Sequence, residues 1–239
     1  MEERAEYLGT SAIFSGHSSD FRNEVLAAGD SQITGKARLQ DRPVAGLKLR
    51  LSLNGKVMSQ WGTTDSTGSY SISVPAGRYQ VTGYELDHAS PDRVLAGKIM
   101  RPQRETLDST LIQAAPDKVA SGPDLDFTEP VVLTGPVGDQ SSNAKVIITW
   151  QPFPGAASYR GQLDESERRT QFFGETKFVY DWASRPLVSS NSFDVSSAQA
   201  KLKPGYYYHA RVEALGANGK VISETPNGKG NLGFRMPAT

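Results

Sequence analysis

The stretch 46–53, GLKLRLSL, alternates between leucine and residues that are polar or small. Because successive side chains of a β-strand point to opposite faces, this pattern predicts a strand with one buried leucine face and one wet face. The Asn54-Gly55 pair that follows is the strongest short signal for a hairpin turn. We therefore expect residues 56–64 to return as the partner strand.

Similar short alternating runs recur along most of the chain, with Gly, Pro and Asn between them. They include ITGKARL, YSISV and RYQVTGYEL in the first half and KVIITW, TKFVYDW and YYYHARVEA in the second. No stretch has the pattern of a long helix. Short strands at regular spacing, separated by turn residues, predict an all-β protein of antiparallel sandwiches rather than a parallel α/β sheet.

The length of 239 residues suits one large or two modest domains. Residues 116–128 gather Pro, Gly, Ser and Asp, as linkers do. We therefore predict two tandem sandwiches joined by this linker, and we leave the first thirty residues unassigned. The predicted parts are an N-terminal segment 1–30, a sandwich 31–115, a linker 116–128 and a sandwich 129–239.

Composition and charge exclude several classes of function. Lys and Arg total 26, Asp and Glu also total 26, and this balance argues against broad capture of nucleic acid. The absence of Cys excludes disulfides, thiolate catalysis and Cys-ligated zinc. No apolar run is long enough to span a membrane. The acidic start, residues 1–16, lacks the pattern of a signal peptide, so the protein is cytoplasmic or its signal segment is absent from this sequence.

Residues 35–84 resemble the regulatory-like domain of carboxypeptidases, a transthyretin-like β-sandwich. The resemblance rests on Gly35, PVAG at 43–46, TTDSTGSY at 63–70 and VPAGRYQV at 74–81, which includes Gly77. In that family the domain is usually an accessory fold of secreted and surface proteins without catalytic activity, and related folds bind carbohydrate or partner proteins. The resemblance therefore implies an extracytoplasmic location: periplasmic, cell-surface or secreted.

Residues 129–239 resemble a fibronectin type III domain, an immunoglobulin-like sandwich. The resemblance rests on Trp150, GAASY at 155–159, LKPG at 202–205, Tyr208 and RVEA at 211–214. It implies that Trp150 is the core indole. It also implies that Tyr208 is a tyrosine-corner residue whose hydroxyl bonds to backbone near the LKPG turn. The segment 166–182 is longer than the usual middle strands of this family.

Asp65 is the one carboxylate of the TTDSTGSY motif, and it suggests either a metal site or a turn. A calcium loop needs several carboxylates at close spacing, which this motif lacks. We expect a turn in which Asp65 accepts backbone hydrogen bonds and Gly68 adopts a positive φ. The linker acids Asp124, Asp126 and Glu129 keep the linker solvated or converge on calcium, and the sequence leaves both alternatives open.

The second domain also offers candidate ligand-binding residues. On the strand YYYHARV, the residues Tyr207, His209 and Arg211 share a parity and should face outward together. Such a stripe could bind a sugar ring or a peptide by stacking and hydrogen bonds, or it could be an ordinary solvated sheet face. Tyr180 and Trp182 are the other candidate ligand-facing aromatics.

Trp61 is expected to lie on the inner side of its strand, because it shares the parity of Val57 and Thr63 on the predicted partner strand. This parity favours a position in the core.

No motif for catalysis is present: there is no paired His motif, no nucleophile elbow and no phosphate-binding loop. We expect a non-catalytic, exported or surface-associated binding or scaffolding protein without a cofactor or metal. Its partner would be a protein or a glycan, not nucleic acid. The alternative is a carbohydrate-binding accessory module of a larger secreted enzyme or assembly. A hydrolase with its active site between the two domains is a third class, which would need converging Asp, Glu and His.

Overall fold

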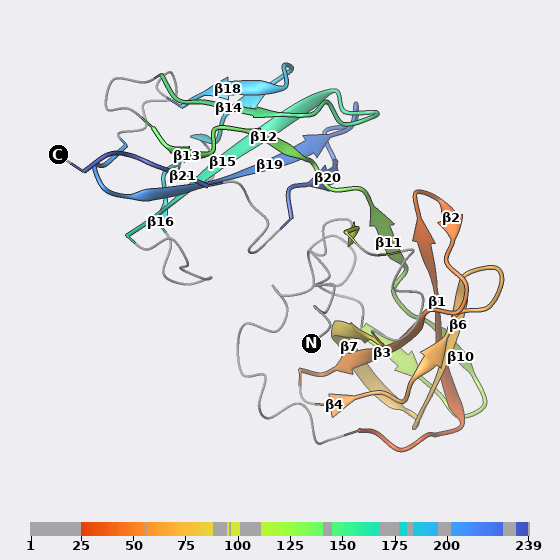
Figure 1. Cartoon of the computed structure of the whole chain (residues 1–239). Helices are drawn as coiled ribbons and strands as arrows, with labels where there is room; N and C mark the ends of the chain where they lie inside the picture. The colour runs from red at the N-terminus through yellow and green to blue at the C-terminus, as the bar shows by residue number, and fades with distance from the viewer. Residues whose placement is uncertain are drawn as a thin grey trace, which may run out of the picture. The chain divides into compact units, whose positions relative to one another are not determined.

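The computed structural model divides the chain into two compact units, residues 1–128 and 129–239 (Figure 1). The structure describes the following residues: 25–55, 57–87, 95, 97–100, 111–140, 145–167, 177–180, 184–195, 202–226 and 233–238.

The described strands of the first unit form two sheets. One sheet has the order β10-β1-β11-β8, with β2 and β6 also paired to β1, and the other has the order β4-β3-β7-β9, with β5 paired to β3. The strands are β1 (Ser31–Leu39), β2 (Arg42–Pro43), β3 (Lys48–Leu53), β4 (Val57–Met58), β5 (Gly62–Thr63), β6 (Ser69–Val74), β7 (Gly77–Leu86), β8 (Ile99–Met100), β9 (Leu111–Ala114), β10 (Val119–Ser121) and β11 (Leu125–Thr128).

Both sheets of the first unit contribute to one apolar core, which makes the unit a sandwich. The predicted leucine face of β3 is confirmed, since Leu47 and the leucines that alternate after it, up to Leu53, are fully buried. The predicted hairpin is confirmed as well. Asn54 and Gly55 have φ values of 54° and 63°, as a tight hairpin turn requires, and Leu53 pairs with Val57.

The segment 116–128 is not the linker that its composition predicted. It contains β10 and β11, which both run parallel with β1, and Leu125 and Phe127 are buried in the core. Gly122 and Pro123 lie between these two strands. There the chain passes from pairing with residues 32–34 of β1 to pairing with residues 37–39. The β1 sheet is therefore mixed, whereas the described pairs of the β3–β7 sheet are antiparallel.

The predicted core position of Trp61 is wrong, because its side chain is 37% exposed. The pairing with β3 is interrupted between β4 and β5, where Ser59 accepts a hydrogen bond from the Leu51 amide at 2.9 Å. Strand parity therefore does not carry from Val57 to Trp61. The Arg50 guanidinium lies 4.7 Å from the centre of the Trp61 ring on the outer face of the sheet.

The strands that the structure describes in the second unit also form two sheets. One has the order β12-β14-β18, and the other has the order β13-β21-β19-β15-β16, with β17 paired to β15 and β20 paired to β19. The strands are β12 (Leu133–Gly135), β13 (Gly138–Asp139), β14 (Ile147–Trp150), β15 (Ser158–Ser166), β16 (Lys177–Phe178), β17 (Leu187–Val188), β18 (Ser192–Asp194), β19 (Tyr207–Leu215), β20 (Val221–Glu224) and β21 (Gly233–Arg235).

The core of the second unit lies between these sheets. Trp150 is 1% exposed, and its ring centre lies 5.1 Å from that of Tyr159 and 6.0 Å from that of Phe193. The Lys203 amide donates to the Tyr208 hydroxyl at 2.6 Å, the geometry of a tyrosine corner. A three-stranded sheet packed on a larger one is the arrangement of immunoglobulin-like sandwiches, which fibronectin type III domains share. The predicted all-β fold class is thus confirmed.

We expect Tyr208→Phe to lower the free energy of unfolding by about 1 kcal/mol, because the Lys203 amide loses its acceptor. The measurement is urea denaturation followed by tryptophan fluorescence. Tyr207→Phe is the matched control, since it removes a hydroxyl from the neighbouring residue, on the opposite face of the strand. Equal stability of the two variants would contradict a structural role for the corner.

Candidate functional site

The outer face of the β15–β19 pair is the most polar surface that the sequence singled out. The strands pair antiparallel from Ser158 opposite Leu215 to Ser166 opposite Tyr207. This register places three outward pairs in a row, and each pair joins polar or charged side chains. The pairs are Arg160 with Glu213, Gln162 with Arg211, and Asp164 with His209.

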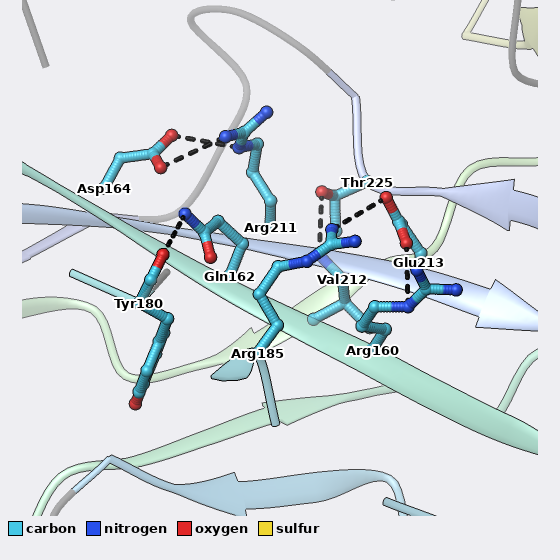
Figure 2. A network of polar contacts seen from close by, with 9 residues as sticks. All are labelled: Arg160, Gln162, Asp164, Tyr180, Arg185, Arg211, Val212, Glu213 and Thr225. Atoms are coloured by element: carbon cyan, nitrogen blue, oxygen red, sulfur yellow. Dashed lines mark hydrogen bonds and ion pairs between the residues drawn. The ribbon is translucent and has the colours of Figure 1, made fainter. Parts of the chain in front are cut away.

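Ion pairs connect these side chains across the strands (Figure 2). Arg211 holds the Asp164 carboxylate with two contacts, Nε to Oδ2 at 2.9 Å and Nη2 to Oδ1 at 3.1 Å. Glu213 accepts a hydrogen bond from Arg185 Nη1 at 3.2 Å, and its second oxygen lies 3.4 Å from Arg160 Nε. The carboxylates of Asp164 and Glu213 are therefore both held by guanidinium groups.

This polar network is largely shielded from solvent. Gln162, Asp164 and Arg185 are all buried, and Gln162 donates to the Tyr180 carbonyl at 3.5 Å. Nearby, the Val212 amide donates to the Thr225 hydroxyl at 3.2 Å (Figure 2). Buried charges in this arrangement are stable only while they are paired. The face is thus a paired and partly shielded network rather than an open row of solvated side chains.

Burial shifts the protonation of three groups here. It raises the pKa of Asp164, while Arg211 acts in the opposite direction. It lowers the pKa of His209, against the attraction of Asp164. Burial, and then repulsion from Glu213, raises the pKa of Glu224 to about 7. Glu224 lies directly across from Glu213 in the β19–β20 register.

The raised pKa of Glu224 makes stability depend on pH in a defined direction. Between its ordinary pKa of 4.5 and about 7, the folded state binds a proton that the unfolded state has lost. The free energy of unfolding should therefore fall as pH rises through this window, by about 3 kcal/mol. We expect Glu224→Gln to remove this component, measured by urea denaturation from pH 4.5 to 8. An identical pH slope in the variant would contradict the assignment.

The three residues predicted as an outward stripe do share one face of β19, since burial alternates along the strand. They do not form an open platform. Arg211 is held by Asp164, His209 is only partly accessible, and the Arg235 guanidinium lies 5.2 Å from the centre of the Tyr207 ring. Their assignment as ligand-binding residues stays a prediction.

Tyr180 is not a surface aromatic. It is 3% exposed and packs against Phe193 in the core, with ring centres 6.4 Å apart. Trp182, the other predicted aromatic, lies outside the described residues.

The Asp65 carboxylate belongs to a turn. Its Oδ1 accepts hydrogen bonds from the Thr67 hydroxyl at 2.7 Å, the Thr67 amide at 2.8 Å and the Ser69 amide at 3.0 Å. These bonds, the Thr67 hydroxyl first, lower the pKa of Asp65. Gly68 has a φ of 76°, as this turn was expected to require.

Gly77 begins β7, after Pro75, whose carbonyl accepts a hydrogen bond from the Tyr79 hydroxyl at 2.7 Å.

The acids at 124–129 have structural contacts too. Asp124 and Asp126 both pair with Arg38, at 3.1 Å and 3.4 Å. The Glu129 carbonyl accepts a hydrogen bond from the Ser223 hydroxyl at 2.6 Å. Across the described ranges, no group of three or more His, Asp or Glu side chains is arranged to hold a metal ion.

The sequence analysis did not identify the β15 side chains that pair with the stripe on β19. Arg160, Gln162 and Asp164 alternate with apolar or small residues, which is the same signal that identified the leucine face of β3. Reading that alternation against the Tyr207–Arg211 strand would have placed opposite charges face to face. Arg185 has no comparable signal, because it lies beside the short strand β17 (Leu187–Val188).

No protein-family model and no curated protein matches the chain. Among solved structures, the chain is similar to a DUF3823 family protein from Parabacteroides merdae, at 15% identity over 84% of this chain and 98% of that one, with a TM-score of 0.24. It is also similar to the fibronectin(III)-like modules of Clostridium thermocellum CbhA, at 15% identity over 93% and 92%, with a TM-score of 0.26. At these TM-scores the similarities carry no argument, and the fold rests on the chain's own strands.

Proposed function

We propose that the protein is a non-catalytic binding or scaffolding protein of the extracytoplasmic space, acting through exposed sheet faces and loops on a protein or glycan partner. The main support for the proposal is that other groups of the chain hold the candidate acids in place. Asp164 is held by Arg211, Glu213 by Arg185 and Arg160, and Asp65 by its own turn.

General acid–base catalysis needs a carboxyl or imidazole within hydrogen-bond reach of a bound substrate. A carboxylate that is clamped by a guanidinium and shielded from solvent cannot approach one without breaking a buried ion pair. Glu165 is constrained in the same way, since Lys203 Nζ lies 2.5 Å from its Oε1. These contacts support a structural use of the acids rather than a catalytic one.

The extracytoplasmic part of the proposal comes from the resemblance of residues 35–84 to an accessory domain of secreted and surface proteins. In the part of the chain that the structure describes, no helix is long and apolar enough to cross a bilayer. Tyr207 and Tyr180 cannot form an exposed aromatic row that stacks on a sugar, because Tyr180 lies in the core. The alternative of a carbohydrate module therefore gains no support from these two residues.

The test is a paired assay of the full chain. Retention on panels of polysaccharides and purified cell-surface proteins is measured beside turnover of glycoside, ester and peptide substrates. We expect retention without turnover. Turnover that disappears in Asp164→Asn or Glu224→Gln, while circular dichroism shows both variants folded at the assay temperature, would overturn the non-catalytic proposal.

A further inference from the structure

The first unit contains an open groove of about 740 Å³ on the outer face of its β1 sheet. Thr34 and Lys36 of β1 lie along it, between β6 on one side and β10 on the other. The turn that contains Asp65 borders the β6 side, and the segment that contains Asp124 borders the other. The volume is in the range of small-ligand pockets, roughly 300–1,000 Å³.

The side of the groove near Asp124 is held firmly in place. The Gly122 amide donates to the Thr34 carbonyl at 2.6 Å, and the buried Tyr70 hydroxyl donates to the Pro123 carbonyl at 2.5 Å. The Lys36 amide also donates to Asp124 Oδ1 at 2.8 Å. A rigid wall lowers the conformational cost of binding, because little needs to be ordered when a ligand arrives.

Several polar groups in the groove are available to a ligand. Within the described ranges, the Thr63 and Ser121 hydroxyls form no hydrogen bond with another protein group, and Lys36 Nζ has no carboxylate within 4 Å, although its charge attracts that of Asp65. Asp65 uses only Oδ1 in its turn, which leaves Oδ2 as an acceptor. The groove thus combines a cationic donor, an anionic acceptor and hydroxyls that both donate and accept.

The composition of the lining narrows the class of ligand. Two cations, Lys36 and Arg38, are balanced by two acids, Asp65 and Asp124, so the groove does not select an ion by net charge. It has no aliphatic side chain to anchor a peptide. A sugar ring matches this set of groups, because adjacent hydroxyls can donate to a carboxylate and accept from an ammonium group at once.

We propose that this groove binds a neutral glycan, with Lys36 and Asp65 contacting adjacent sugar hydroxyls and Thr63 and Ser121 adding further hydrogen bonds. The inference rests on the proposed binding function and specifies its ligand class. It assigns the glycan site to residues of the first unit, whereas the aromatic residues that the sequence suggested belong to the second. Asp65 has a second role in its turn, so Lys36, Thr63 and Ser121 are the residues to test.

The experiment measures binding of the full chain to neutral tetrasaccharides of glucose, mannose, xylose and N-acetylglucosamine by calorimetry. Lys36→Met and the double variant Thr63→Val/Ser121→Ala are compared with Lys118→Met, which changes an exposed lysine of the same unit outside the groove. We expect at least one tetrasaccharide to bind, and each groove variant to bind it about tenfold or more weakly. Lys118→Met should bind like the wild type, and thermal melts should show all variants folded.

Each other outcome overturns the inference in a distinguishable way. Equal binding by the groove variants would place the glycan elsewhere and leave the proposed function intact. A wild type that binds only sialylated or sulfated oligosaccharides would contradict the neutral class. If the wild type binds a cell-surface protein but no tetrasaccharide, the groove is not a glycan site, although the protein still binds a partner. Turnover of a substrate would overturn the proposed function itself.

Discussion

Arg211→Ala is expected to lower the free energy of unfolding by about 3 kcal/mol, because it leaves the Asp164 carboxylate shielded and without its counterion. The Asp164 side chain is only 12% exposed, and Arg211 contacts both of its oxygens. Urea denaturation at pH 7 gives the value directly. A change under about 0.5 kcal/mol, typical of surface substitutions, would contradict the importance of this pair.

The double variant Arg211→Met/Asp164→Leu distinguishes the contribution of the ion pair from the cost of leaving one buried charge without a partner. Replacing both charges by apolar side chains of similar volume removes the unpaired carboxylate and retains much of the packing. We expect it to be more stable than Arg211→Ala alone. If the stability lost in the double variant equals the sum of the losses in Arg211→Met and Asp164→Leu, the two residues act independently and the coupling is refuted.

Gly35→Ala should lower the free energy of unfolding by about 3 kcal/mol, as expected for overpacking at a site that cannot relax. A Cβ at Gly35 would lie 2.3 Å from the Pro123 carbonyl oxygen and 2.5 Å from the Tyr70 hydroxyl. Those two atoms form a hydrogen bond with each other, so neither can move without breaking it. The substitution therefore disturbs the sheet and the wall of the groove together.

Gly77→Ala is the matched control, because the nearest atom to its added Cβ is the Tyr79 hydroxyl at an ordinary 3.4 Å. We expect a change within about 0.5 kcal/mol. Chemical denaturation and circular dichroism measure both variants. A Gly35→Ala variant as stable as Gly77→Ala would show that the Pro123 segment can shift freely.

Much of the fold follows from the sequence because burial on one face imposes period-2 alternation. This rule identified the leucine face of β3, and the Asn54-Gly55 pair identified its turn. It failed for Trp61, where a break in pairing changes the parity. It also failed for 116–128, because β10 and β11 span only three and four residues, too few to stand out from the Pro, Gly and Asp residues around them.

The candidate sites were less predictable, because they depend on which strands become neighbours. The ion pair between Asp164 and Arg211 joins residues of different strands, and the groove joins residues of β1 to distant turns. Only the Asp65 turn lies within one short motif, and there residue preferences alone sufficed. Local patterns specify strands and turns, whereas the partner of each strand depends on the whole chain.

The sharing of β1 between early and late strands has a consequence for synthesis on the ribosome. The amide of Lys36 bonds to an acid 88 positions further along the chain, and the parallel partners of β1 are β10 and β11. Until those residues leave the exit tunnel, β1 has only β2 and β6 to pair with, and its remaining backbone groups stay hydrated or open to other chains. Translation arrested at residue 115 should therefore leave a nascent chain that is sensitive to protease and is recognised by chaperones, whereas arrest after the first unit has fully emerged should not.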